Sequence, residues 1–253
     1  MKSEERVAVI TGATSGIGFE VAKRLGKDGF NVILNGIDDP AGADKVKELS
    51  AEGIKAEYYG FDVTNEDAVN SNIKTIGDKY GKIDVVINNA GGLGGRSRFE
   101  DMTTDFYRSV MALNLDSTFF VSRAAIPYLR KSDYACIINY TSNAGWNAGG
   151  PGAGIYGTSK AAVHTITRAL AKDLAEYGIR VNAVSPGTID TPFHSQIKST
   201  KPEVFESWKN NIMLGRLGQP EDVASVVSFL ASKDSKFITA ETIQVGGGQA
   251  LGI

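Results

Sequence analysis

The sequence contains few residues that form disulfide bridges or bind metals. Its 253 residues include one cysteine and two histidines. One cysteine forms no disulfide within the chain, which favours a reducing compartment. Cys136 lies in the apolar run ACIINY without a histidine nearby, so we expect a buried thiol rather than a nucleophile. His164 and His194 have no partner at the spacing of metal ligands, so we expect no metal site.

The sequence also lacks an excess of charge of one sign and lacks long apolar runs. The net charge is −2, with acids and bases interspersed. This balance favours neither nucleic acid nor a membrane surface as a partner. No apolar run approaches the roughly 20 residues that span a bilayer, and the first one follows acidic residues in MKSEERVAVITG. We therefore expect a cytoplasmic protein with a small-molecule partner.

Short β-branched runs alternate with amphipathic segments along nearly the whole chain. The candidate strands are residues 7–11, 31–35, 56–63, 84–90, 135–142, 180–186 and 242–247. Several are apolar without alternation, which is typical of parallel strands covered on both faces. The segments between them have apolar positions at helical spacing. The pattern predicts one α/β domain over residues 1–253, a Rossmann-type doubly wound parallel sheet of seven strands with helices on both faces.

One irregular stretch interrupts this alternation, residues 188–217. It follows a late strand and contains prolines, mixed charge and aromatic residues. Ligands of open α/β sheets bind outside the carboxyl ends of the strands. We therefore expect this stretch to be a substrate lid.

The first candidate strand leads directly into the glycine-rich loop TGATSGIG, and a helical segment follows. Gly12, Gly16 and Gly18 would let the backbone turn tightly and approach a pyrophosphate at the helix N-terminus. The alternative is that these glycines serve only a tight turn. Asp62 with Val63, the NNAG motif and the SPGTIDTP motif follow later strands, where they would meet the same ligand.

TGATSGIG, NNAG, the serine of SNAG, YGTSK and SPGTIDTP together resemble the short-chain dehydrogenase/reductase family over essentially the whole chain. The resemblance implies a seven-stranded Rossmann-type subunit, a nicotinamide cofactor and a homotetramer. The residues that it assigns to the cofactor are Gly12, Thr14, Ser15, Gly16, Ile17, Gly18, Gly36, Ile37, Asp62, Val63, Asn89, Ala90, Gly91, Tyr156, Lys160, Pro186, Gly187, Ile189 and Thr191.

The residues near the predicted adenosine site favour NAD(H) over NADP(H). A 2′-phosphate needs a cation, which in this family usually stands just before the middle glycine of the loop or just after the second strand. Ser15 occupies the first position, and the second region is Asn35-Gly36-Ile37-Asp38-Asp39, without a cation. The alternative for the two acids is that they start the next helix, and both interpretations can hold.

Tyr156 and Lys160 have the spacing of side chains on one face of a helix. A nearby ammonium lowers the pKa of a tyrosine toward the range useful for proton transfer. We expect Tyr156 to donate a proton to a carbonyl oxygen while hydride arrives from the cofactor. Ser142 would steady that oxygen. The resemblance adds Asn114, which would connect the lysine to solvent through a water on its backbone.

The substrate loops give a finer hypothesis. NNAGGLGGR, NAGGPGAGIYGTSK and TIDTPFH with TKPEV are similar to reductases of 4-deoxy-5-keto-hexoseulose uronate, which form a 2-keto-3-deoxy acid. We therefore expect an NADH-dependent reductase of a keto or aldehydo sugar acid, with an anionic substrate. The candidate substrate residues are Arg96, Asn143, Trp146, Gly149, Gly150 and His194.

Other functions stay open on the sequence alone. A 3-oxoacyl thioester reductase would need an exposed basic patch for an acidic carrier protein, and none stands out. The stretch NGIDDP is similar to 3-hydroxybutyrate dehydrogenases, whose serine loop is more polar. A dinucleotide-binding regulator without chemistry would have degenerate catalytic positions, whereas Asn114, Ser142, Tyr156 and Lys160 are all present.

Overall fold

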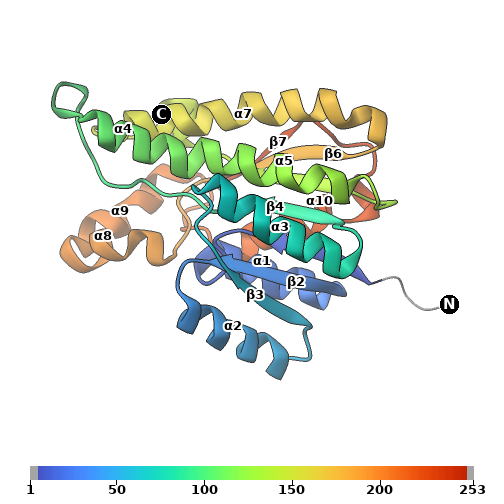
Figure 1. Ribbon diagram of the computed structural model, residues 1–253. Helices are drawn as coiled ribbons and strands as arrows, with labels where there is room; N and C mark the ends of the chain where they lie inside the picture. Colours follow the sequence, from blue (N-terminus) through green and yellow to red (C-terminus); the bar gives the residue numbers. More distant parts are fainter. Residues whose placement is uncertain (1–4, 250–253) are drawn as a thin grey trace.

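Seven parallel strands form one sheet in the order β3-β2-β1-β4-β5-β6-β7 (Figure 1). The computed structural model describes residues 5–249, without the side chain of Gln196, so the ends of the predicted domain, 1–4 and 250–253, lie outside the described part. The strands are β1 (Arg6–Ile10), β2 (Phe30–Gly36), β3 (Ala56–Gly60), β4 (Val85–Asn88), β5 (Cys136–Tyr140), β6 (Arg180–Pro186) and β7 (Thr242–Val245). The strand order reverses between β1 and β4, where ligands of such sheets bind.

Helices cover both faces of the sheet. The helices of the described residues are α1 (Gly16–Lys27), α2 (Asp39–Ala51), α3 (Glu66–Tyr80), α4 (Thr104–Met111), α5 (Ser117–Leu129), α6 (Ala144–Asn147), α7 (Gly154–Leu174), α8 (Ser195–Thr200), α9 (Pro202–Ser207) and α10 (Pro220–Leu230). Helices α1, α2 and α10 share one buried cluster with the sheet, and α3, α5 and α7 share another. Figure 1 shows α3 beside α5. Within residues 5–249, no helix is long and apolar enough to cross a membrane.

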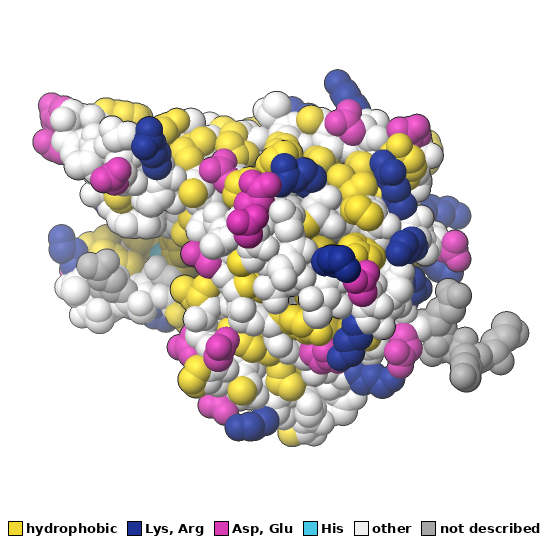
Figure 2. Space-filling model, viewed as in Figure 1, with side chains coloured by type: hydrophobic (Ala, Val, Ile, Leu, Met, Phe, Trp, Pro, Cys, Tyr) yellow, Lys and Arg dark blue, Asp and Glu magenta, His cyan; other side chains and the backbone are white. Residues whose placement is uncertain are grey.

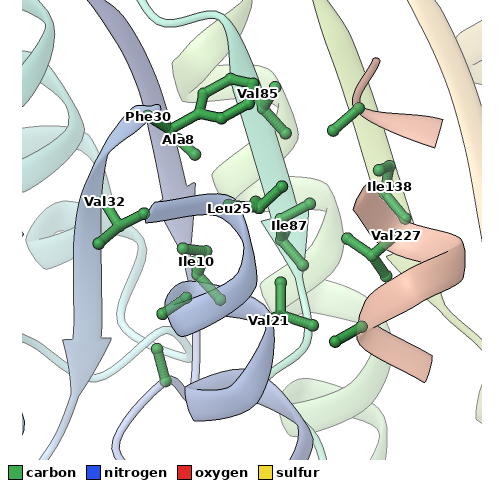
Figure 3. Close-up of a cluster of buried hydrophobic side chains, with 14 of the residues drawn as sticks. Ala8, Ile10, Val21, Leu25, Phe30, Val32, Val85, Ile87, Ile138 and Val227 are labelled. Carbon is green, nitrogen blue, oxygen red and sulfur yellow. The ribbon is translucent and has the colours of Figure 1, made fainter. Parts of the chain in front are cut away.

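The apolar strands alternate between these two clusters. In β1, Val7 and Val9 belong to one cluster, whereas Ala8 and Ile10 belong to the other. Figure 3 shows Ile10 near Val21 of α1. Each face is covered, so both sets of side chains are apolar and the strands are apolar without alternation. The arrangement confirms the predicted fold class.

Cys136, the first residue of β5, is fully buried in this core. Burial raises the pKa of its thiol to about 11, because the thiolate would lose its hydration. A neutral, inaccessible thiol behaves as a small apolar side chain. The prediction of a buried thiol is confirmed.

Strand β3 is shorter than predicted and ends at Gly60 rather than at Val63. The carboxylate of Asp62 accepts hydrogen bonds of 2.8 Å from both the backbone nitrogen and the hydroxyl of Thr64. This local turn removes the chain from the sheet just before α3 begins. Side-chain competition for backbone donors, which apolar patterning does not reveal, therefore sets the end of the strand.

Residues 188–217 contain regular structure, although the sequence pattern there is irregular. Helices α8 and α9 lie within the segment, together with two short 3-10 turns at Pro192–His194 and Trp208–Asn211. Figure 1 shows α8 and α9 at one side of the molecule, and Figure 2 shows a hollow between this region and the body. The segment forms one wall of the cavity described next.

Candidate active site

A cavity of about 650 Å³ lies at the carboxyl ends of the central strands. Its wall is built from parts of residues 12–18 after β1, 89–91 after β4, 140–150 after β5, 156–160 of α7, 186–194 after β6 and 208–211, with Gln249 near the C-terminus. These segments are far apart in the sequence. The parallel sheet brings them together because all its strands end at the same edge.

The glycine loop after β1 forms one end of the cavity. Gly12 and Gly16 have φ of 61° and 53°, a region that favours glycine. At Gly18, an added Cβ would lie 2.3 Å from the carbonyl oxygen of Gly12. Helix α1 begins here without an acid in its first turn and without a side-chain cap from Ser15. Its free N–H groups and positive dipole end therefore suit a pyrophosphate.

Asn89 holds this loop in shape. Its side-chain nitrogen donates hydrogen bonds of 2.9 Å to the carbonyl oxygens of Thr11 and Gly12. The Thr11 hydroxyl accepts in return from the backbone nitrogens of Asn89 and Ala90, at 3.1 and 3.0 Å. The loops after β1 and β4 are thus joined by four hydrogen bonds. Asn89 therefore fixes the position of the glycine loop.

Most of the residues predicted to hold the cofactor line this cavity. They are Gly12, Ser15, Gly16, Ile17, Gly18, Asn89, Gly91, Tyr156, Lys160, Pro186, Gly187, Ile189 and Thr191. The predicted residues that do not line it are Thr14, Gly36, Ile37, Asp62, Val63 and Ala90. Four of these six lie at the ends of β2 and β3: Gly36 is the last residue of β2, and Ile37, Asp62 and Val63 follow the two strands.

The end of β2 is acidic. Asp38 caps α2 by accepting from the backbone nitrogen of Ala41 at 3.1 Å. The Asp39 carboxylate packs over Gly60, where an added Cβ would lie 2.0 Å from Oδ1. Gly60 is the register partner of Gly36. The acids therefore both start the helix and place negative charge beside the end of β2.

Ser142, Tyr156 and Lys160 meet at the wall of the cavity. Burial raises the pKa of Tyr156, whereas the sequence suggested that Lys160 would lower it, and a hydrogen bond with Ser142 opposes the rise in part. The hydration that the phenolate would lose outweighs the nearby ammonium. The Lys160 ammonium lies 5.8 Å from the centre of the Tyr156 ring and donates to the carbonyl oxygen of Tyr140 at 3.0 Å. Burial lowers the pKa of Lys160 to about 8, because the charged form loses water. A protonated phenol with a nearby cation is suited to proton transfer.

Asn114 lies behind this group, in a π-helical turn (Ala112–Asp116) that the sequence did not predict. Its amide donates to the carbonyl oxygens of Gly92 and Val110, each at 2.9 Å, and accepts from the Gly92 nitrogen at 3.0 Å. An added Cβ at Gly91 would lie 2.8 Å from Asn114 Oδ1 and 2.9 Å from Lys160 Nζ. Asn114 therefore holds the chain after β4 against the lysine, and π turns of this kind are frequent at functional sites.

The predicted substrate residues divide into two groups. Asn143, Gly149, Gly150 and His194 line the cavity, whereas Arg96 and Trp146 do not. The Arg96 guanidinium donates to the carbonyl oxygen of Pro151 at 2.9 Å. The Trp146 indole donates to Ser185 at 3.3 Å and packs edge-on against His164, with ring centres 4.5 Å apart. Local bonds thus hold these two side chains outside the cavity wall.

Gln249 is a cavity residue that the sequence analysis missed. Its carbonyl oxygen accepts from Asn143 Nδ2 at 3.1 Å and from the Thr188 nitrogen at 2.8 Å, and its nitrogen donates to the Thr188 hydroxyl at 2.9 Å. Gly247 and Gly248 precede it with φ of 58° and 85°. The only signal in the sequence was the glycine run GGGQ. Gln249 ties the neighbour of Ser142 to the chain after β6.

We predict that Gln249→Leu lowers kcat/KM for carbonyl reduction about tenfold, because hydrogen bonds worth roughly 1 kcal/mol each are lost at the cavity wall. Steady-state kinetics and the melting temperature together check this. Gln244→Leu is the matched control, since Gln244 is an exposed residue of β7. Equal kcat/KM for the two folded variants would contradict the assigned role.

The chain is similar to known proteins over nearly its whole length. Residues 12–250 match a family model described as enoyl-(acyl carrier protein) reductase. The chain is 38% identical over 255 residues to a diacetyl reductase [(S)-acetoin forming] of Staphylococcus aureus, covering 97% of this chain and 98% of that protein. It is 38% identical over 253 residues to the 3-oxoacyl-[acyl-carrier-protein] reductase FabG of Thermotoga maritima, covering 99% and 100%.

The fold also matches solved structures. A variant of the actinorhodin polyketide ketoreductase with NADPH superposes with a TM-score of 0.92 at 31% identity, covering 99% of each chain. Together with the family model, these full-length similarities show that the protein is an oxidoreductase and that it belongs to the short-chain dehydrogenase/reductase family.

Proposed function

We propose that the protein reduces a carbonyl compound with a nicotinamide dinucleotide and that Tyr156 supplies the proton. The observation that carries the proposal is one cavity with the glycine loop at one end and Ser142, Tyr156 and Lys160 in its wall. The family binds NAD(P)(H), and the loop after β1 fits its pyrophosphate, because only glycine leaves room at position 18. When bound, the nicotinamide supplies the hydride.

The side chains of the protein carry out the proton transfer. Burial keeps Tyr156 protonated, so its hydroxyl can donate to the oxygen of the carbonyl. Ser142 Oγ accepts from the backbone nitrogen of Ala144 at 3.1 Å and bonds the Tyr156 hydroxyl, so a carbonyl oxygen that reaches Tyr156 can also accept from Ser142. The Lys160 ammonium stabilises the phenolate as it forms. Alcohol oxidation uses the same groups in reverse.

We also propose that NADH is preferred over NADPH. The support is the acidic end of β2, where Asp38 and Asp39 would repel a 2′-phosphate and where residues 35–39 contain no cation. Steady-state kinetics with each cofactor is the test, and a higher kcat/KM with NADPH would overturn the proposal.

Ile37→Arg tests the same idea by gain of function. Ile37 is 83% exposed, so the substitution should leave the core intact. We predict that the new cation raises kcat/KM for NADPH about tenfold, because it pairs with the 2′-phosphate. Ile37→Gln is the uncharged control. If both variants change kcat/KM for NADPH equally, charge at this position does not select the cofactor.

The substrate that we propose is a hydroxylated, sugar-derived carbonyl compound. The support for the deoxy uronate itself is the resemblance of residues 88–96, 147–160 and 188–204 to uronate reductases. The Thermotoga relative favours a second candidate, a 3-oxoacyl thioester. A panel of the uronate, neutral sugar carbonyls, diacetyl and an acetoacetyl thioester separates these classes, and a clear preference for the thioester would exclude sugars.

Assembly and location are part of the same proposal. We propose a homotetramer, because the family resemblance implies one, and light scattering of the purified protein tests it. The single cysteine supports a cytoplasmic location. The alternative of a regulator without chemistry would be excluded by turnover of any carbonyl in the panel.

A further inference from the structure

One half of the cavity, lined by residues after β5 and by the 188–217 segment, has a neutral wall. It is formed by Asn147, Gly149 and Gly150 after β5 and by Phe193, His194, Trp208 and Asn211 of the 188–217 segment. Among the described residues that line the whole cavity, Lys160 is the only one with a charged side chain of Lys, Arg, Asp or Glu type. Its ammonium already bonds the Tyr140 carbonyl oxygen beside Tyr156.

His194 adds no positive charge at neutral pH. Its ring lies within an aromatic cluster, with ring centres 4.9 Å from Phe193, 5.6 Å from Phe205 and 5.3 Å from Trp208. Burial is the main cause that lowers its pKa, and Lys198 lowers it further, although Asp190 acts in the opposite direction. An imidazole so placed is uncharged.

Two lysines of the 188–217 segment are paired with acids. Lys198 pairs with Asp190 at 2.5 Å, and Lys209 pairs with Glu206 at 3.2 Å. The Arg96 guanidinium bonds the carbonyl oxygen of Pro151. The Arg96 Nη1 atom would lie 3.6 Å from a Cβ added at Gly150, so this cation stands behind the wall rather than in it. A carboxylate that entered this half of the cavity would lose water and would meet no Lys or Arg among the described residues that line it, which is costly.

The polar groups that remain suit hydroxyls. The Asn147 side-chain oxygen accepts from the Gly149 nitrogen at 2.9 Å, which leaves its two N–H donors for a ligand. Asn211 lines the cavity, and its amide offers both donors and an acceptor. Trp208 is held by Phe205 and His194, with ring centres 5.3 Å away in each pair, so it presents a flat apolar surface at a defined angle.

We propose that this half of the cavity selects an uncharged, hydroxylated carbonyl substrate, with its hydroxyls on Asn147 and Asn211 and its C–H face against Trp208. Neutral hydroxyls satisfy amide donors and acceptors without the desolvation cost of an ion. The inference rests on the proposed carbonyl reduction and assigns its substrate class. It separates neutral sugar carbonyls from the uronate that the sequence pattern suggested.

A pair of substrates that differ in one group tests the inference. Dihydroxyacetone and hydroxypyruvate differ only in a CH₂OH that replaces a carboxylate, and diacetyl serves as a carbonyl without hydroxyls. With NADH, we expect kcat/KM for dihydroxyacetone to exceed that for hydroxypyruvate at least about tenfold, although the keto acid is the more electrophilic. An equal or higher kcat/KM for hydroxypyruvate overturns the inference.

Charge added to the wall gives an independent test. Asn211→Arg should raise kcat/KM for hydroxypyruvate relative to dihydroxyacetone about tenfold, because a guanidinium binds a carboxylate through two hydrogen bonds. Asn210→Arg is the matched control, since Asn210 is exposed and does not line the cavity. The same change in both variants overturns the assignment of Asn211.

Substitutions that remove or keep an aromatic ring test the role of Trp208. Trp208→Ala should raise KM for L-erythrulose, a longer neutral hydroxyketone, about tenfold and more than it raises KM for diacetyl, and Trp208→Phe should restore most of the difference. Equal effects on both substrates overturn the role of Trp208.

If the wild-type enzyme reduces diacetyl but shows no preference for the hydroxylated ketones, the inference alone fails. If it turns over no carbonyl, the proposed function fails with it.

Discussion

Tyr156→Phe is expected to lower kcat for carbonyl reduction about 10²–10⁴-fold, the range that a positioned proton donor contributes. The variant keeps the ring and loses only the hydroxyl that bonds Ser142. The glycine loop is untouched by this change, so NADH binding should fall far less than kcat. Steady-state kinetics and fluorescence titration with NADH measure the two effects separately.

The pH profile adds a second measurement. Reduction needs the protonated phenol of Tyr156 and oxidation needs the phenolate, so raising the pH should slow reduction and speed oxidation. The shapes of the two profiles should change in the small residual activity of Tyr156→Phe, although the proton consumed in reduction keeps the ratio of the two rates dependent on pH. Tyr107→Phe is the control, because Tyr107 is an exposed residue of α4. Residual activity above about one tenth of the wild type would exclude Tyr156 as the donor.

Gly18→Ala is expected to weaken NADH binding at least about tenfold. The added Cβ would lie 2.3 Å from the Gly12 carbonyl oxygen and 2.5 Å from Asn89 Nδ2, so the glycine loop must move. Gly12 and Asn89 are joined by one of the hydrogen bonds that shape this loop. The displaced N–H groups would no longer converge on the pyrophosphate. Titration of the folded variant with NADH measures the loss.

Gly92→Ala is the matched control. Its added Cβ would meet only Leu113, at an ordinary contact of 3.6 Å, and its backbone bonds to Asn114 would remain. Melting temperatures of both variants separate loss of binding from loss of folding. NADH affinity close to wild type in Gly18→Ala would show that the loop after β1 does not carry the pyrophosphate.

The sequence predicted the parts of the site that depend on local spacing. Tyr156 and Lys160 share a helix face because they are four residues apart, and α7 begins at Gly154. Ser142 follows β5, and parallel strands end at one edge of a sheet, so a residue just past a strand was predictable as a cavity residue. The glycine loop was likewise recognisable from its place between a strand and a helix.

Other parts depended on contacts between distant segments. Gln249 meets Asn143 and Thr188 only because the chain after β7 passes the ends of β5 and β6. Arg96 and Trp146 stand beside the predicted site in the sequence, yet bonds to Pro151 and Ser185 hold them outside it. The sequence shows which side chains lie near the site along the chain. It does not show which hydrogen-bond partner a flexible side chain will have in the fold.

The sequence by itself determined the fold class and the oxidoreductase family, and it predicted the candidate catalytic residues, because apolar periodicity and short motifs act over a few neighbouring residues. The charge of the cavity wall formed by the residues after β5 and by the 188–217 segment was decided only by the tertiary structure. His194 is neutral because aromatic rings from the 188–217 segment surround it, and Lys198 is occupied by Asp190. Desolvation and pairing arise from packing in three dimensions, so no count of basic residues along the chain could have supplied them.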